Sequence, residues 1–272
     1  MLSVLIPSRN EKFLNRTIDD IFEKATGEIE VIVTLDGYWP EPLPKERKNL
    51  ILIHRSQAQG MRAAINGAAA IAKGEYLLKS DAHCMFDQGF DVKVTQACVD
   101  KMIVVPRRLS LDADNWCLKK EKSPVDYHYL TYPFEKWNEI GPHGAVWYER
   151  ARARRDVIFD EEMSWQGSFW CMRRTHWDRL GGMSEIGFGK FVQEAQELGL
   201  KTWLGGGRVM TLKSTWIAHL HKGKDMGRGY FLDKREMITG AHYSTDYWLN
   251  DRWQERKHNM LWLVKRFWRV PS

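Results

Sequence analysis

Residues 76–83 read Tyr-Leu-Leu-Lys-Ser-Asp-Ala-His, a largely apolar run that ends in a carboxylate and an imidazole. We expect a strand over residues 75–80, because the run is short and follows a glycine. Three similar runs precede it, at residues 2–7, 29–35 and 49–54, and each is followed by polar or turn-forming residues. The sequence therefore predicts a series of short buried strands in its first third.

Helical spacing alternates with these strands. A helix is expected to begin near Phe13, an Ala-rich helix to run from Met61 to Ala72, and a further helix to span residues 191–198. This alternation is typical of an α/β fold with a doubly wound, mostly parallel sheet and helices on both faces. Ligands of such folds bind beyond the carboxyl ends of the strands, which is where the polar residues lie.

The length suits one catalytic domain with a C-terminal extension. We predict a domain over residues 1–222, followed by a basic, aromatic extension over residues 223–272. Within the domain, residues 1–105 are expected to form a nucleotide-binding half and residues 106–222 an acceptor-side half. The periodicity loosens in the Tyr-, Trp- and Pro-rich stretch 107–160, which we interpret as acceptor-side elaboration.

The composition excludes several classes of protein. Hydrophobic residues make up 43% and charged residues 28%, as in globular proteins rather than disordered or membrane-embedded ones. A net charge of +6 indicates an anionic partner. The four cysteines show neither a CxxC pair nor zinc spacing, so we expect reduced thiols. With no apolar run long enough to span a bilayer and no signal-peptide pattern, a cytoplasmic location is expected.

Asp81 and His83 are candidate metal ligands. In extended backbone, residues i and i+2 face the same way, so both side chains can reach one cation at the end of the strand. A divalent ion there would bridge diphosphate oxygens and stabilise a leaving nucleotide as a Lewis acid. An isolated Asp-x-His is a weak signal by itself, because both residues are common at the start of loops.

Further motifs support this interpretation. Along the chain they are Pro7-Ser8-Arg9-Asn10-Glu11, Asp36 at the end of the second strand, Gly60-Met61-Arg62-Ala63-Ala64-Ile65-Asn66-Gly67, and Asp81-Ala82-His83. In this order they resemble glycosyltransferase family 2 and the polypeptide N-acetylgalactosaminyltransferases, both of GT-A (Rossmann-like) fold. Asp-x-His is the form of the metal motif found in the latter group. The resemblance implies a metal-dependent transferase that moves a sugar from a nucleotide diphosphate donor, a UDP-sugar, to a hydroxyl.

The resemblance continues to residue 222. Residues 167–174, followed by Leu180-Gly181-Gly182-Met183, are similar to the segment that supports the donor sugar. Residues 193–199 stand at the family's acidic helix start, where Glu194 is the match for the site carboxylate and Glu197 the alternative. Residues 216–222 resemble the segment that supplies a third metal ligand, with His219 the better match and His221 the alternative.

The resemblance also implies a role for each residue. Asp36 and the loop of Pro7, Ser8, Arg9 and Asn10 hold the nucleoside, with Ser80 in the same donor site. Asp81, His83 and His219 hold Mn²⁺ or Mg²⁺ on the diphosphate, and Asp81 thereby takes part in catalysis. Arg62 and Lys222 add positive charge at the phosphates. If the sugar configuration inverts, Glu194 is the catalytic base; if it is retained, Glu194 binds acceptor or sugar.

Each of these residues also has a structural interpretation. His219 and His221 are compatible with solvated histidines on a strand face, and Asp36 with an ordinary turn residue before Gly37. Glu194 is compatible with a solvated helix face paired with a lysine. Arg62 is different, because a cation at a helix start opposes the macrodipole and therefore indicates an anionic ligand nearby.

Two basic segments bear on the acceptor. Residues 149–155 carry Arg at alternate positions, so an extended conformation would present a one-sided cationic strip suited to a phosphate backbone. Residues 248–268 mix tryptophans with Arg and Lys, as in proteins that bind single strands or flipped bases. The same stretch is compatible with an amphipathic helix on a membrane surface or one packed on its own domain.

These segments favour DNA with a hydroxymethylated base as acceptor, as in virus-encoded DNA glycosyltransferases acting in the host cytoplasm. A cell-envelope polysaccharide, a lipid or a cytosolic protein are the alternative acceptors. A different class of function is a non-catalytic protein that binds nucleic acid or carbohydrate on the same scaffold.

Overall fold

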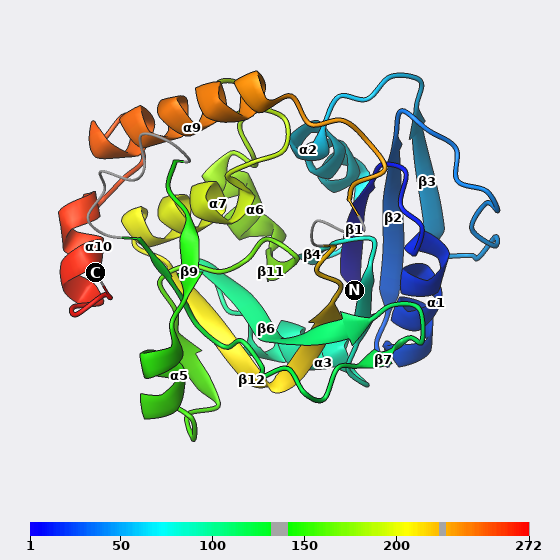
Figure 1. Cartoon of the computed structure of the whole chain (residues 1–272), viewed down its shortest axis with the longest axis horizontal. Coiled ribbons are helices and arrows are strands. Elements are labelled where there is room, and N and C mark those ends of the chain that lie inside the picture. Colours follow the sequence, from blue (N-terminus) through cyan, green and yellow to red (C-terminus); the bar gives the residue numbers. More distant parts are fainter. Residues whose placement is uncertain (132–140, 223–226, 272) are drawn as a thin grey trace.

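The computed structural model describes residues 1–131, 141–222 and 227–271. Its main sheet (Figure 1) contains the strands β1 (Leu2–Ser8), β2 (Ile29–Asp36), β3 (Leu50–Arg55), β4 (Tyr76–Ser80), β5 (Cys84–Phe86), β6 (Met102–Asp112), β7 (Cys117–Leu118), β10 (Phe159–Glu161), β11 (Phe169–Arg173) and β12 (Arg208–His219). A separate hairpin pairs β8 (His128–Leu130) with β9 (Gly144–Val146). The helices are α1 (Leu14–Lys24), α2 (Met61–Ile71), α3 (Phe90–Ala97), α5 (Tyr148–Ala153), α6 (Arg174–Leu180), α7 (Glu194–Leu204), α9 (Lys234–Leu249) and α10 (Met260–Arg266).

The sheet order is β10-β12-β6-β11-β4-β1-β2-β3, with β5 on β12 and β7 on β6. Strands β3, β2, β1 and β4 are parallel neighbours, and β6 is parallel to β12. Strand β11 is antiparallel to β4 and β6 and joins the two parallel blocks. The α/β fold with a mostly parallel sheet is confirmed.

Helices cover both faces of the sheet because successive strand residues point in opposite directions. Val4 belongs to a core cluster shared with α1 and α3, whereas its neighbour Leu5 belongs to a cluster shared with α2, α6 and α7. All eight residues of β2 are buried. Such near-continuous apolar runs are typical of parallel strands covered on both faces.

The C-terminal helices pack on this core. Trp248 and Phe267 are almost fully buried and belong to the same cluster as Trp203 of α7. The rings of Trp203 and Phe267 meet edge to face, with centroids 5.2 Å apart. Of the alternatives that the sequence leaves open for residues 248–268, the structure therefore shows packing on the domain.

The expected cationic strip at residues 149–155 is wrong. This segment forms α5 and its C-cap, so alternate residues do not share a face. The helical period instead places Arg150 and Arg154 one turn apart, and both guanidinium groups reach Oδ2 of Asp160 at 3.2 Å. Of the stretch 107–160, residues 132–140 lie outside the described residues, as do residues 223–226 and 272 of the extension.

No helix of the described residues is both long and apolar enough to cross a membrane.

Candidate active site

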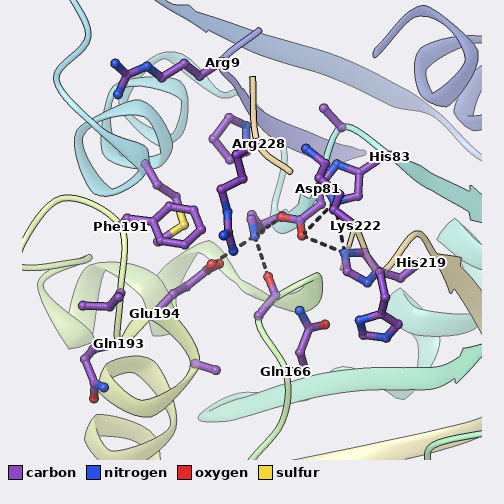
Figure 2. Close-up of a pocket in the computed structure, with 18 of the residues that line it drawn as sticks. Arg9, Asp81, His83, Gln166, Phe191, Gln193, Glu194, His219, Lys222 and Arg228 are labelled. Atoms are coloured by element: carbon purple, nitrogen blue, oxygen red, sulfur yellow. Dashed lines mark hydrogen bonds and ion pairs between the residues drawn. The ribbon is translucent and has the colours of Figure 1, made fainter. Parts of the chain in front are cut away.

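A cavity of about 800 Å³ opens at the carboxyl ends of β1, β2, β4 and β12 (Figure 2). Its walls come from distant parts of the chain, including the loop after β1, the start of α2, the turn after β4, the start of α7 and the segment after β12. The position agrees with the rule that ligands of α/β sheets bind beyond the carboxyl ends of the strands.

Three predicted metal ligands meet in this cavity. Nε2 of His219 lies 3.2 Å from Oδ2 of Asp81 and 3.2 Å from Nε2 of His83. The third side of the triangle, from Nε2 of His83 to Oδ2 of Asp81, measures 3.8 Å. Figure 2 shows the three side chains pointing at one another from the ends of β4 and β12.

The local geometry of the motif differs from the expected extended strand. Strand β4 ends at Ser80, and residues 82 and 83 form a turn that leads into β5. Strand β5 then pairs with β12, with Cys84 opposite His219, and the amide of Leu220 donates to the carbonyl of His83 at 3.2 Å. The convergence of the ligands therefore results from the β5–β12 ladder.

The pKa values of Asp81 and His219 favour the protonation states in which these side chains can bind a cation. Burial lowers the pKa of His219 to about 3, so its imidazole is neutral at neutral pH and one of its two ring nitrogens carries a lone pair. Burial opposes the charge of Asp81, but the Lys79 ammonium and the His219 hydrogen bond outweigh it and hold the pKa of Asp81 well below its usual range. A metal requires this combination of protonation states.

The donor set fits one first-row divalent ion. Ligands about 2.1 Å from a cation are about 3.0 Å apart at right angles and about 3.4 Å apart at tetrahedral angles. The observed separations of 3.2, 3.2 and 3.8 Å are close to these values. Two imidazoles with one carboxylate suit Mn²⁺ better than Mg²⁺, which prefers oxygen ligands.

His221 lies outside this group. Its ring stands edge to face on that of His219, with centroids 4.9 Å apart, and it is the exposed member of the pair. The atoms that lie within 4.8 Å of one another belong to Asp81, His83 and His219. Between the two alternatives that the sequence left open, the geometry favours His219.

Lys79 is a site residue that the sequence analysis missed. Its Nζ is buried and lies 2.6 Å from Oδ1 of Asp81 and 3.0 Å from Oε2 of Glu194, and it also donates to the carbonyl of Gly167. A lysine inside an otherwise apolar strand was the available signal, because a buried ammonium requires anionic partners. The two carboxylates outweigh the effect of burial and raise the pKa of Lys79.

Glu194 is buried at the first residue of α7, and both of its carboxylate oxygens have partners. Oε2 pairs with Lys79, and Oε1 accepts a 2.8 Å hydrogen bond from the indole of Trp170. Burial raises the pKa of Glu194 against the opposing effect of Lys79. Gly167 approaches so closely that a Cβ there would lie 2.9 Å from Oε2 of Glu194. These contacts hold the Glu194 side chain in the lining of the cavity, so it does not lie on a solvated helix face.

Glu197, the alternative to Glu194, lies in the core. Its carboxylate pairs with Arg62 and with Lys201, and Oε1 accepts from the amide of Ser184 at 2.9 Å. The prediction that a negative charge lies near Arg62 was therefore correct, but this charge belongs to the Glu197 side chain and not to a bound ligand. Arg62 is 1% exposed, stacks over Phe188, and does not line the cavity. Its predicted role at the phosphates is corrected accordingly.

Pro7, Ser8, Arg9 and Asp36, predicted to hold the nucleoside, line the cavity at the carboxyl ends of β1 and β2. Asp36 is buried, and its two oxygens accept from the amides of residues 59 and 60 at 2.9 and 2.8 Å. These bonds hold the turn that begins α2. The Asp36 carboxylate therefore holds part of the cavity wall in place from the end of β2. An ordinary turn residue before Gly37 would not need these two hydrogen bonds.

Two residues of the predicted donor site do not reach the cavity wall. The Ser80 hydroxyl is fully buried and donates to the carbonyl of Asp81 at 3.0 Å, which stabilises the turn after β4. Asn10 adopts a left-handed conformation, with φ of 52°, and its amide donates to the carbonyl of Gly229 at 2.6 Å. Neither residue is part of the lining, so these placements are corrected.

Lys222 lines the cavity, and its ammonium pairs with Glu11 at 2.6 Å. Glu11 also reaches Nδ1 of His83 at 3.2 Å, and so supports a metal-ligand ring from behind. Burial opposes ionisation of Glu11, but His83 and Lys222 outweigh it and lower its pKa. The sequence analysis gave Glu11 no role, although its position directly after the loop of residues 7–10 could have indicated one.

Arg228 and Tyr230 complete the cavity and were not predicted. Figure 2 shows Arg228 over Phe191, and the guanidinium carbon lies 5.0 Å from the ring centroid. Arg9 stacks similarly over Tyr230 at 4.9 Å. Two cations thus lie on aromatic rings in the cavity lining, where they are available to an anionic ligand.

A family model described as Glycosyl transferase family 2 matches residues 3–161. Among curated proteins, the putative polypeptide N-acetylgalactosaminyltransferase 13 of Drosophila melanogaster is 25% identical over 188 residues, which cover 65% of this chain and 30% of that protein. The chain thus spans less than a third of the length of this relative.

Two solved structures have a similar fold. GalNAc-T7, crystallised with UDP, GalNAc and Mn²⁺, matches with a TM-score of 0.73 at 15% identity, over 92% of this chain and 49% of that one. Residues 1–349 of S. aureus TarS in complex with UDP-GlcNAc match with a TM-score of 0.51 at 13% identity, over 90% of this chain and 72% of that one. At these identities, the likeness concerns the fold.

Proposed function

The chain belongs to glycosyl transferase family 2, and from this membership we propose that it transfers a sugar from a nucleotide diphosphate donor to an acceptor hydroxyl with the help of a divalent metal. The observation that carries the proposal is the meeting of Asp81, His83 and His219 in the large cavity at the sheet edge. The two solved structures of similar fold contain UDP with GalNAc and Mn²⁺, or UDP-GlcNAc, which supports a UDP-sugar donor and Mn²⁺ here.

The residues of the cavity suit a diphosphate leaving group. A bound divalent cation supplies Lewis-acid stabilisation of the developing charge on the nucleotide. Lys222, Arg9 and Arg228 bring positively charged groups to the lining of the cavity. Glu11 orients His83, while Lys79 fixes one oxygen of Asp81 and leaves Oδ2 toward the histidines. Asp36 and the loop after β1 are proposed to hold the nucleoside.

We also propose that the sugar configuration is retained. Inversion would require a base on the acceptor side, and Glu194 is a poor base because both of its oxygens have partners. The other acidic residues lining the described cavity are also engaged: Glu11 by Lys222, Asp36 by two backbone amides, and Asp81 by Lys79. Glu194 then binds sugar or acceptor. NMR of the product shows whether the anomeric configuration is retained or inverted. An inverted product would contradict this proposal and favour Glu194 as the catalytic base.

Donor turnover is the direct test of the proposed function. The protein is incubated with a panel of UDP-sugars and Mn²⁺, and release of UDP is measured with and without a chelator. We expect chelator-sensitive release that is lost in Asp81→Asn, while Lys93→Met, which changes a partly exposed ion pair that does not line the cavity, remains active. Absence of release with every donor would favour the non-catalytic binding protein instead.

Hydroxymethylated DNA stays a prediction as the acceptor. The two sequence segments that favoured it are used for packing: α5 through Asp160, and residues 248–268 through the core. A cell-envelope polysaccharide, a lipid or a protein remain the alternatives. Filter binding to duplex DNA across a salt series tests the prediction, because affinity that is weak and flat with salt would remove nucleic acid from consideration.

A further inference from the structure

Arg108 carries a partly buried positive charge without an ionic partner. Its Nη1 is buried and makes no hydrogen bond, and its Nη2 faces Nε2 of His128 at 3.4 Å. No carboxylate of the described residues forms an ion pair with it. By contrast, the neighbouring Arg107 makes two hydrogen bonds, of 2.7 and 2.8 Å, to Asp126. An unpaired buried charge is costly and therefore indicates a partner from outside the chain.

Glu162 attracts the charge of Arg108 but forms no ion pair with it. Glu162 lies behind His128, with 4.0 Å between its Oε2 and Nδ1 of the ring. Burial raises the pKa of Glu162 well above its usual range, which favours the neutral acid. A small space of about 10 Å³ beside these groups has room for about one water molecule. A water there would satisfy a hydrogen bond, but it would not compensate the charge.

Arg108 lines the large cavity from β6, and β11 and β4 lie between β6 and β1, whose loop is proposed to hold the nucleoside. On β6 it pairs with Ile217 of β12, two residues before the metal-ligand His219. Its neighbours on this wall include His128, His143, Trp165 and Gln166. The acidic residues that line the described cavity are Glu11, Asp36, Asp81 and Glu194, and each already has a partner. This wall therefore presents positive and neutral donors, without a free carboxylate.

We propose that Arg108 binds an oxyanion of the acceptor, a phosphate or a carboxylate, close to the hydroxyl that receives the sugar. The inference rests on the proposed transferase function, because it assumes that the donor occupies the opposite side of the cavity. Burial lowers the pKa of Arg108 to about 10, so the guanidinium is still charged at neutral pH. A guanidinium fork recognises either anion through paired hydrogen bonds.

Stability provides the first test, and it requires no ligand. We expect Arg108→Met to raise the thermal midpoint by about 2 °C or more, because an uncompensated buried charge is removed. The matched control is Arg107→Met, which breaks the pair with Asp126 and should lower the midpoint. A fall in the midpoint of Arg108→Met similar to that of Arg107→Met would overturn the proposal, because Arg108 would then have a structural partner.

Anion binding provides the second test. With the donor side saturated by UDP and Mg²⁺, inorganic phosphate or acetate is titrated at constant ionic strength, and the midpoint is followed. Phosphate, acetate or both should stabilise the wild type and Arg107→Met. In Arg108→Met the apparent affinity should fall about tenfold. The anion that stabilises more strongly identifies the group. Equal stabilisation of Arg108→Met and wild type, or of neither by either anion, contradicts the proposal.

Failure of this inference can be separated from failure of the proposed function. Binding of UDP with metal is measured in the same samples by calorimetry, and it should be unchanged in Arg108→Met. Loss of UDP binding in that variant would place Arg108 at the donor and overturn the acceptor assignment. If the wild type itself binds no UDP, the proposed function fails, whereas the anion titration without nucleotide still reports on Arg108.

Discussion

The ammonium of Lys79 lies 2.6 Å from Oδ1 of Asp81 and so determines which oxygen of that carboxylate faces His83 and His219. The same ammonium reaches Glu194 at 3.0 Å. One buried cation thereby joins a candidate metal ligand on the turn after β4 to the first residue of α7.

Replacing Lys79 by Met should destabilise the fold. Asp81 and Glu194 would lose their shared counter-charge in a buried site, and we expect the free energy of unfolding to fall by about 3 kcal/mol. The double variant Lys79→Met/Glu194→Gln should recover part of this loss, because one uncompensated charge is removed. Urea denaturation of the two variants and of Lys93→Met, which breaks a partly exposed pair with Asp87, measures the effect. A Lys79→Met midpoint equal to the wild type would show that the pair does not stabilise the fold.

Metal affinity should depend on the three converging residues and not on His221. Loss of groups that merely support metal ligands costs about 10–100-fold in affinity, so Asp81→Asn and His219→Gln should each cost at least about 100-fold. His221→Gln is the matched control and should leave the affinity nearly unchanged. Calorimetric titration with Mn²⁺ in the presence of UDP gives the three values. An equal loss in His221→Gln would mean that the ligand set has been assigned wrongly.

Arg62 and Lys222, both predicted at the phosphates, should behave oppositely. Arg62→Met breaks the buried pair with Glu197, so the free energy of unfolding should fall by about 3 kcal/mol while the UDP affinity of the folded protein is unchanged. Lys222→Met removes a charge from the cavity and should weaken UDP binding about tenfold. Glu197→Gln keeps the shape of the side chain and provides a milder test of the same pair. The placement of Arg62 is refuted if its variant folds stably and loses UDP.

Stability should decrease in mild acid, in part because of His176. This side chain is 2% exposed, its Nε2 meets Oγ1 of Thr202 at 3.0 Å, and burial lowers its pKa to about 4. The unfolded chain takes up this proton near pH 6.5, whereas the folded chain does not until about pH 4. The unfolded state thus binds more protons between these values, and stability falls with decreasing pH by up to about 3 kcal/mol, then levels off.

The variant His176→Gln isolates this contribution, because the other buried histidines remain in both proteins. Urea midpoints are compared at pH 7.5 and 5.0. The variant should be less stable than the wild type at pH 7.5 but should lose less stability on acidification. Parallel losses in the two proteins would show that His176 is not the responsible group.

Local patterns were sufficient for the first four strands and for two of the three candidate metal ligands. Apolar runs of five to eight residues are short enough to be recognised without their neighbours, and β1, β2, β3 and β4 lie within one or two residues of the predicted ranges. Asp81 and His83 are adjacent in sequence to the end of such a run. Their closeness to each other was therefore expected, although a turn and not extended backbone brings it about.

The partners of charged side chains could not be predicted in this way. Arg62 and Glu197 are 135 residues apart, and Lys79 and Glu194 are 115 residues apart. The sequence shows that a buried cation needs an anion, but it does not show which one. The basic segment 149–155 illustrates the same limit. Its arginine pattern is compatible with an extended strand and with a helix, and only the structure shows the helix and its ion pair with Asp160.

The sequence by itself determined the alternation of strands and helices, and hence the sheet edge at which a ligand site forms. Only the tertiary structure decided that His219 joins Asp81 and His83, and that Glu194 is held by Lys79 and Trp170. It also decided that Arg108 is partly buried without an ion-pair partner. The reason is physical: secondary structure follows from the periodicity of neighbouring residues, whereas the pairing of charges depends on which strands and helices pack together and on how much water they exclude.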